Sequence, residues 1–282
     1  MVNPSTVAPI DLHEDIHWGD FGQVTDDHEH TGTFAALLAK DPPSVTRLPF
    51  LLPRIVAVRF KARKMDYFLW CHDSQGRPVV TLTLTTDADV AVHMDALAPH
   101  GARDLAQLLA GAPAVKSLTV CTDFDIDGLR SEDIRGMLTT FPALEEFHLE
   151  GCSLDNHLIH LWALFTPTSK PGEEVDILCP KLKTLTVKNG DFAWYGGDDF
   201  FDNILPMLRE RDACGSRLDS LDLELMEGAV DEEGEDSEEE ASKKEYERLK
   251  AKYLPELEKL VTEVTYNYLD YVEYDWERDM DI

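Results

Sequence analysis

One short phrase recurs along the chain and limits the folds available to it more than any other feature. Each copy reads apolar-x-x-apolar-x-apolar, so its last three positions alternate between apolar and other residues. Clear copies lie at 115–120, 144–149, 182–187 and 218–223, and weaker copies at 55–60 and 79–84. This alternation is typical of a strand with one buried face. A short strand cannot bury that face alone, so the repeats predict strands stacked around one continuous core.

Segments with helical character separate the strand phrases. They cover 103–110, 131–138, 155–165 and 198–212. The first of them ends at Gly111 and Pro113, which are common helix-stop residues. Strands that alternate with helices favour parallel strands joined by crossover helices. We therefore predict an α/β fold, a leucine-rich-repeat solenoid (horseshoe) with parallel strands on its concave face and helices on its convex face.

Composition divides the chain into four parts. We expect an acidic N-terminal arm and cap at 1–47, the solenoid at 48–226, a disordered acidic insertion at 227–244, and a last helix–strand unit with an acidic aromatic tail at 245–282. Residues 231–240 are almost entirely acidic, which predicts a self-repelling loop. Pro255 is expected to kink or split the helix at 242–260, before a last strand at 261–266. The tail could cap the solenoid or bind a partner.

The charge of the chain excludes some classes of partner. The formal net charge is −29, and residues 224–282 hold 21 acidic but only 7 basic side chains. This balance opposes binding to nucleic-acid phosphates and favours basic partners. The one basic cluster, between Arg54 and Lys64, is expected to be neutralised within the protein. No segment is suited to spanning a membrane or to acting as a secretory signal, so we expect a cytoplasmic or nuclear protein.

Sequence signals for catalysis and metal binding are weak. Residues 13–17 match the zinc-binding pattern His-Glu-x-x-His, but nearby prolines and glycines give poor support for the required helix. Phosphate-binding loops and nucleophile motifs are absent from the sequence. The five cysteines show no paired spacing and are expected to be reduced and mostly buried, and Trp70 and Trp162 are expected in the core. We therefore expect no enzyme, no cofactor and no metal site.

Three longer phrases resemble a known family. They are Phe141-Pro142-x-Leu144-x-x-Phe147-x-Leu149-x-Gly151-Cys152, Cys179-Pro180-Lys181-Leu182-Lys183-x-Leu185-x-Val187 and Leu205-Pro206-Met207-Leu208-x-x-Arg211-x-Ala213-Cys214-Gly215. Together they resemble the leucine-rich repeats of fungal F-box-like proteins over about residues 48–270. The resemblance implies the substrate-recognition half of a ubiquitin-ligase receptor. The resemblance also makes a ligase adaptor a possible partner. However, the F-box, the segment that would dock such an adaptor, is not evident in residues 1–50.

Outward-facing strand positions are the predicted partner-binding residues. They are Arg59, Lys61, Thr119, Glu146, His148, Glu150, Thr184, Thr186, Lys188, Asp222 and Glu224. Threonine also suits strands for its shape alone, whereas the pattern Glu-x-His-x-Glu has no such explanation. We expect a protein–protein interaction module whose partner is another protein, with no nucleic acid and no membrane. The alternative is an acidic leucine-rich-repeat protein that binds basic proteins such as histones.

Overall fold

The computed structural model describes residues 7–16, 34–62, 66–86, 102, 105–110, 112–122, 131–151, 162–168, 175–191, 197–226 and 237–269. These residues form an α/β protein in which most neighbouring strands are parallel. The chain divides into two compact units. Unit 1 comprises Met1–Phe147 with Leu178–Lys181, and unit 2 comprises His148–Ile177 with Leu182–Ile282.

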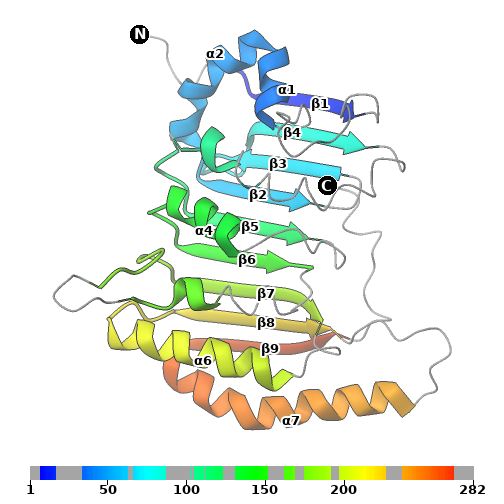
Figure 1. The fold of residues 1–282 in the computed structure, drawn as a ribbon, viewed down its shortest axis with the longest axis vertical. Helices are drawn as coiled ribbons and strands as arrows, with labels where there is room; N and C mark the ends of the chain where they lie inside the picture. The colour runs from blue at the N-terminus through cyan, green and yellow to red at the C-terminus, as the bar shows by residue number, and fades with distance from the viewer. Residues whose placement is uncertain are drawn as a thin grey trace. The chain divides into compact units, whose positions relative to one another are not determined.

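Unit 1 is built on five neighbouring strands, in the order β1-β4-β3-β2-β5 (Figure 1). The strands are β1 (Ile10–Ile16), β2 (Ala57–Ala62), β3 (Asp66–His72), β4 (Pro78–Thr86) and β5 (Ser117–Thr122). The helices are α1 (Phe34–Lys40), α2 (Pro42–Leu51) and α4 (Ser131–Thr140), with a 3-10 turn, η3 (Leu52–Arg54). The strand β6 (Glu146–Glu150) spans the division between the units.

Unit 1 departs from the predicted parallel solenoid at β3. This strand runs antiparallel to both β2 and β4, where the prediction placed a crossover. The reversal depends on the turn between β3 and β4, in which the Asp73 carboxylate accepts backbone N–H groups of Gln75 at 2.9 Å and Arg77 at 3.1 Å. Gly76 adopts φ +72°, which side-chain-bearing residues rarely accept. A hairpin turn therefore joins β3 and β4, where the solenoid prediction has parallel strands.

Asp73 is the anchor of this turn. Its Oδ2 accepts Nε and Nη2 of Arg77 at 3.0 and 2.8 Å, and Arg54 Nη2 lies 3.8 Å away. The Arg77 hydrogen bonds are the main reason that the pKa of Asp73 falls to about 2. Arg54 of the basic cluster is therefore paired as expected, whereas Arg63 and Lys64 lie outside the described residues.

The N-terminal region contains more structure than the predicted arm. Ile10–Ile16 forms β1 and pairs in parallel with β4. The extended backbone over His13–Ile16 is incompatible with the helix that the His-Glu-x-x-His pattern needs, and His17 lies outside the described residues. Ile10 is 1% exposed, so the burial of this side chain favours the pairing of an otherwise acidic segment with the sheet.

Unit 2 combines three parallel strands with two long helices. The strands are β7 (Thr184–Asp191), β8 (Ser220–Met226) and β9 (Glu263–Leu269), in that order, and the helices are α6 (Gly197–Ala213) and α7 (Ser237–Leu260). The two helices lie side by side against these strands (Figure 1). The predicted helices at 131–138 and 198–212 are confirmed as α4 and α6, whereas most of 155–165 lies outside the described residues.

The helix α7 begins earlier than predicted and is not split at Pro255. It begins at Ser237, inside the stretch expected to be a disordered loop, and it continues without a break through Pro255. Packing of α7 on unit 2 compensates for the hydrogen bond that Pro255 cannot donate.

Strand entry points within each unit share one backbone arrangement. In unit 1 the N–H groups of Lys116 and Ser117 donate to the Val56 carbonyl, and those of Glu145 and Glu146 donate to the Lys116 carbonyl. In unit 2 the N–H groups of Asp219 and Ser220 donate to the Lys183 carbonyl, and that of Glu263 donates to the Asp219 carbonyl. The recurring sequence phrase therefore corresponds to a recurring local structure.

Aromatic residues form the centre of unit 2. Phe201 of α6 stacks on Tyr253 of α7 at 4.4 Å and on Tyr266 of β9 at 5.9 Å. Tyr246 stacks on Tyr266 at 4.9 Å, and its hydroxyl donates to the Tyr266 carbonyl at 2.9 Å. Trp162, 1% exposed, packs edge-on against Phe200, as expected of a core residue. This cluster holds both helices on the strands.

Cysteines follow the prediction in part. Cys71, Cys121 and Cys179 are free thiols and buried, whereas Cys214 is exposed, and Cys152 lies outside the described residues. Burial raises the pKa of the Cys71 thiol far above its usual range, so this thiol is inert as a nucleophile.

Candidate binding face

Strands of both units have one apolar face and one polar face. In β5 the side chains of Leu118 and Val120 are fully buried, while Thr119 between them is partly exposed. In β8 Leu221 and Leu223 are fully buried, while Asp222 and Glu224 are partly exposed. Alternation of this kind directs the second set of side chains away from the core. The polar side of the strands is the candidate binding face.

The polar face of unit 2 is mainly acidic. Parallel register places Glu224 of β8 beside Lys188 of β7 and Asn267 of β9. The preceding row joins Thr186, Asp222 and Thr265. Burial raises the pKa of Glu224, and the negative charges of Asp222 and Glu150 raise it further, while Lys188 opposes the shift. We call Glu150, Lys188, Asp222 and Glu224 the acidic row.

The electrostatics of the acidic row define what it can bind. Glu224 interacts with one ammonium group, Lys188, and with two further carboxylates, Asp222 and Glu150, so the row has a net negative charge at neutral pH. The raised pKa of Glu224 means that another cation near this carboxylate would be stabilising. A lysine or arginine side chain supplied from outside provides such a cation.

The polar face of unit 1 has different chemistry. Antiparallel register sets Arg59 of β2 opposite Trp70 of β3, and Lys61 opposite Phe68. On the other side of β2, Arg59 lies beside Thr119 and Lys61 beside Cys121 of β5. The Nε–H group of Arg59 donates to the Cys121 sulfur at 3.4 Å. Basic and aromatic side chains therefore alternate across the strands.

The predicted binding residues divide between the two units. Arg59, Lys61, Thr119 and Glu146 belong to unit 1, and His148, Glu150, Thr184, Thr186, Lys188, Asp222 and Glu224 belong to unit 2. In β6 the residues Glu146, His148 and Glu150 alternate with buried Phe147 and Leu149, as the phrase predicts.

Two predicted residues are less accessible than expected. Lys61 is 8% exposed and Thr186 is 4% exposed, although the alternation places both on the polar face. Both occupy interior strand positions with neighbours on either side, where adjacent side chains exclude water from a short threonine or from the stem of a lysine.

An aromatic pair, Phe68 and Trp70, lies on the polar face and was not predicted from the sequence. Trp70 was expected in the core, yet it is partly exposed and alternates with Leu69 and Cys71, which are fully buried. Phe68 lies on the same side as Trp70. The turn residues Asp73 and Gly76 were the signal that could have revealed the hairpin and hence this register.

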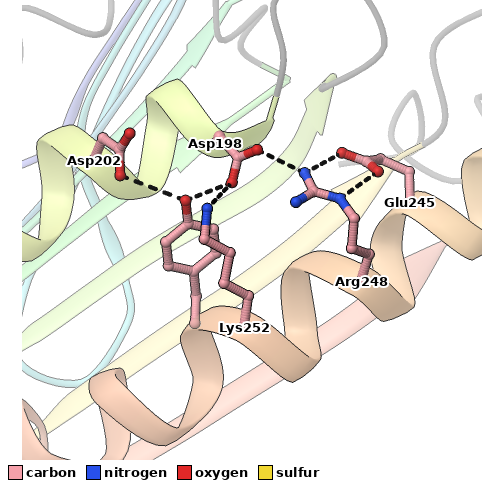
Figure 2. A network of polar contacts seen from close by, with 6 residues as sticks. Asp198, Asp202, Glu245, Arg248 and Lys252 are labelled. Atoms are coloured by element: carbon pink, nitrogen blue, oxygen red, sulfur yellow. Dashed lines mark hydrogen bonds and ion pairs between the residues drawn. The ribbon is translucent and has the colours of Figure 1, made fainter.

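A second polar cluster joins the helices of unit 2 (Figure 2). The Asp198 carboxylate of α6 accepts Lys252 Nζ at 2.6 Å, Tyr253 Oη at 2.5 Å and Arg248 Nη2 at 2.7 Å. These hydrogen bonds hold the pKa of Asp198 well below its usual range. Arg248 is also bound by Glu245. The positive and negative charges of these residues balance one another. We therefore interpret this polar cluster as a clamp that holds α7 on α6, rather than as a reactive site.

Groups of three or more residues suited to holding a metal ion are absent from the described part of the chain. Among the described helices, none is long and apolar enough to cross a membrane. Comparison with models of known families, with curated proteins and with solved structures finds no match.

Proposed function

We propose that this chain is a protein-recognition module whose strand repeats present a polar face to another protein. The repeated phrases resemble the leucine-rich-repeat part of F-box ubiquitin-ligase receptors, and we propose a recognition role of that kind. The recurrent strand entry bonds in each unit support a repeat architecture. The observation that carries the proposal is the alternation of buried apolar side chains with partly exposed polar ones, which is clearest in β5, β6 and β8.

A non-enzymatic role fits the side-chain chemistry of the polar face. Its residues are threonines, carboxylates and basic groups spread along several strands. Recognition surfaces of repeat proteins are extended in this way, whereas catalytic sites concentrate a few groups in a pocket.

Charge reversal in the acidic row tests the proposal. The variant Glu150→Lys with Glu224→Lys is compared with wild type and with Glu258→Lys, an exposed position on α7 that lies away from the strand face. Tagged proteins are incubated with cell extract, and captured proteins are quantified by mass spectrometry. We expect partners that bind wild type and the control but are lost from the double variant. Equal capture by all three proteins would contradict the proposed face.

The acidic row also favours a second function, binding of basic proteins such as histones. The excess of carboxylates over ammonium groups in the acidic row and the raised pKa of Glu224 support a cationic partner. The two functions are separated by deletion of 231–236, which removes acidic residues but leaves α7 intact. Specific recognition by the strand face tolerates this deletion, whereas general acidic binding weakens with the deletion and with rising salt.

A further inference from the structure

Phe68 and Trp70 form a stacked aromatic pair on the polar face of unit 1. Their ring centroids are 4.9 Å apart and their planes differ by 4°. Both side chains are partly exposed, while the intervening Leu69 is fully buried. An aromatic pair on the side of the sheet away from the core leaves apolar ring surface in contact with water. Such surface is a common anchor for a partner's apolar group.

Basic and hydroxyl side chains flank this pair on both neighbouring strands. Arg59 and Lys61 of β2 lie opposite Trp70 and Phe68, respectively. Thr81 and Thr83 of β4 lie opposite the same two rings on the other side. We call Arg59, Lys61, Phe68, Trp70, Thr81 and Thr83 the aromatic–basic platform. It combines stacking surface, positive charge and hydroxyl groups within three adjacent strands.

The Arg59 guanidinium is positioned as well as charged. Its Nε–H group donates to Cys121 on β5, so the side chain lies across the strands. A guanidinium group binds carboxylates in a planar, two-pronged geometry and stacks on aromatic rings. Trp70 lies opposite Arg59 in the register of β3 with β2, on the other side of β2 from Cys121. A ligand that carries both a carboxylate and an aromatic side chain therefore matches the chemistry of both residues.

We propose that the aromatic–basic platform binds a peptide segment of a partner protein in which a carboxylate adjoins an aromatic side chain. The aromatic group packs against Phe68 and Trp70, and the carboxylate pairs with Arg59. This proposal rests on the proposed recognition function, because it names the partner chemistry for the unit 1 part of the same polar face. The acidic row of unit 2 selects the opposite charge.

Single-stranded nucleic acid is the other ligand that strand aromatics and basic side chains bind. The net charge of −29 repels a polyanion, and nucleic-acid affinity depends on several phosphate contacts. Lys61 is only 8% exposed, so Arg59 is the more accessible of the two cations on the platform. One accessible cation suits a single carboxylate better than a phosphate chain.

Fluorescence anisotropy with defined probes tests the platform in the full chain. The probes are a labelled Gly-Asp-Phe-Asp-Gly peptide, its Gly-Asn-Phe-Asn-Gly counterpart and a labelled single-stranded oligothymidylate. We expect the acidic peptide to bind wild type. The asparagine peptide should bind with an affinity at least about tenfold lower. Arg59→Glu should cause a similar loss with the acidic peptide, and Trp70→Leu should also weaken binding. Arg217→Glu, a matched charge reversal in unit 2, should leave affinity unchanged.

Arg59→Gln provides a milder test if the charge reversal disturbs folding, which circular dichroism would reveal. Equal affinity for the two peptides, or unchanged affinity in both Arg59 variants, would overturn the proposal. Tighter binding of the oligothymidylate, with loss in Arg59→Gln, would identify a nucleic-acid surface instead. Failure here is separable from failure of the recognition function, because that function is tested by Glu150→Lys with Glu224→Lys in unit 2.

Discussion

The two units use the same strand phrase to present different side chains, with a basic pair beside two aromatic rings in unit 1 and the acidic row in unit 2. In unit 1 Arg59 and Lys61 adjoin the rings of Trp70 and Phe68, whereas in unit 2 Lys188 is outnumbered by Glu150, Asp222 and Glu224. The core-facing positions are alike in both, because the leucine and valine side chains are fully buried. Burial therefore constrains every second residue, and the intervening residues are free to specify a ligand.

A second contrast concerns how each unit holds its strands. Unit 1 reverses direction at β3 through a turn anchored by Asp73, while unit 2 keeps three parallel strands and covers them with α6 and α7. Unit 1 thus depends on a local polar turn. Unit 2 depends on long-range aromatic packing and on the Asp198 clamp. Variants of the turn in unit 1 and of the aromatic cluster in unit 2, compared by their free energies of unfolding, test this contrast.

The largest expected loss of stability comes from truncating a side chain in the aromatic cluster of unit 2. Phe201 is fully buried and stacks on Tyr253 and Tyr266. Phe201→Ala should lower the free energy of unfolding by about 3–5 kcal/mol, because it removes apolar contacts and leaves a cavity. Hydrogen exchange should show lost protection in β8, β9 and α7. The matched variant Phe60→Ala should affect the strands of unit 1, and identical exchange patterns for both variants would contradict two separately organised units.

Acid titration compares two aspartates, Asp73 in the β3–β4 turn and Asp198 in the clamp. The pKa values of Asp73 and Asp198 are both lowered in the folded state, so their contribution is fully present above the unfolded pKa, about 4. It is lost as the pH falls toward 2, where protonation of Asp73 disrupts its turn. Thermal melts should therefore show declining stability below about pH 4.

Asparagine variants show how much each of the two aspartates, Asp73 and Asp198, contributes to the free energy of unfolding. The Asp73 side chain is 7% exposed and that of Asp198 is 38% exposed, so solvent screens the clamp more strongly. Asp73→Asn should be the more destabilising, and Asp198→Asn should cost no more than about 1 kcal/mol. Chemical denaturation at pH 7 and at pH 3 measures both, and the variants should differ less from wild type at the lower pH. A larger loss from Asp198→Asn would reverse the assigned order.

Much of the strand framework could be predicted from the sequence, and the exceptions have physical causes. Alternation located β2, β4, β5, β6, β7, β8 and β9, since buried leucine and valine positions dictate it. The strand β3 was missed because Phe68, Leu69, Trp70 and Cys71 are apolar without a break. The segment 10–16 was missed because its charges masked Ile10, whose burial depends on distant β4.

The candidate face was predictable only in part. Alternation correctly placed Arg59, Thr119, Asp222 and Glu224 on the polar side of their strands. Hydrophobicity alone assigned Trp70 to the core, because an exposed tryptophan and a buried one look alike in a sequence. Only the antiparallel register of β3 shows that Trp70 shares a face with Arg59.

Two stacked tyrosines in unit 2, Tyr246 and Tyr266, should respond in different ways to loss of their hydroxyl groups. The expected changes in unfolding free energy are smaller than that expected for Phe201→Ala. The Tyr246 hydroxyl donates to the Tyr266 carbonyl, whereas the Tyr266 hydroxyl is buried without a hydrogen-bond partner. Tyr246→Phe should cost about 0.5–1.5 kcal/mol, and Tyr266→Phe should be neutral or stabilising because it removes an unsatisfied buried group. Equilibrium unfolding measures both variants. Destabilisation by Tyr266→Phe equal to that by Tyr246→Phe would show that its hydroxyl is satisfied.

The smallest expected effect sharpens the electrostatic contrast between the two faces. The pKa of Glu224 is raised in the folded state, so its carboxylate opposes folding at pH values above the raised pKa. Glu224→Gln should therefore stabilise the protein at pH 7, by less than about 1 kcal/mol, and this gain should disappear below the unfolded pKa of about 4. The opposite change, Lys188→Gln, should destabilise the protein at pH 7, because it removes the cation that lowers the pKa of Glu224. Denaturation midpoints measured from pH 3 to pH 8 check both signs, and a gain for Glu224→Gln that does not vary with pH would mean that shape, rather than charge, limits this position.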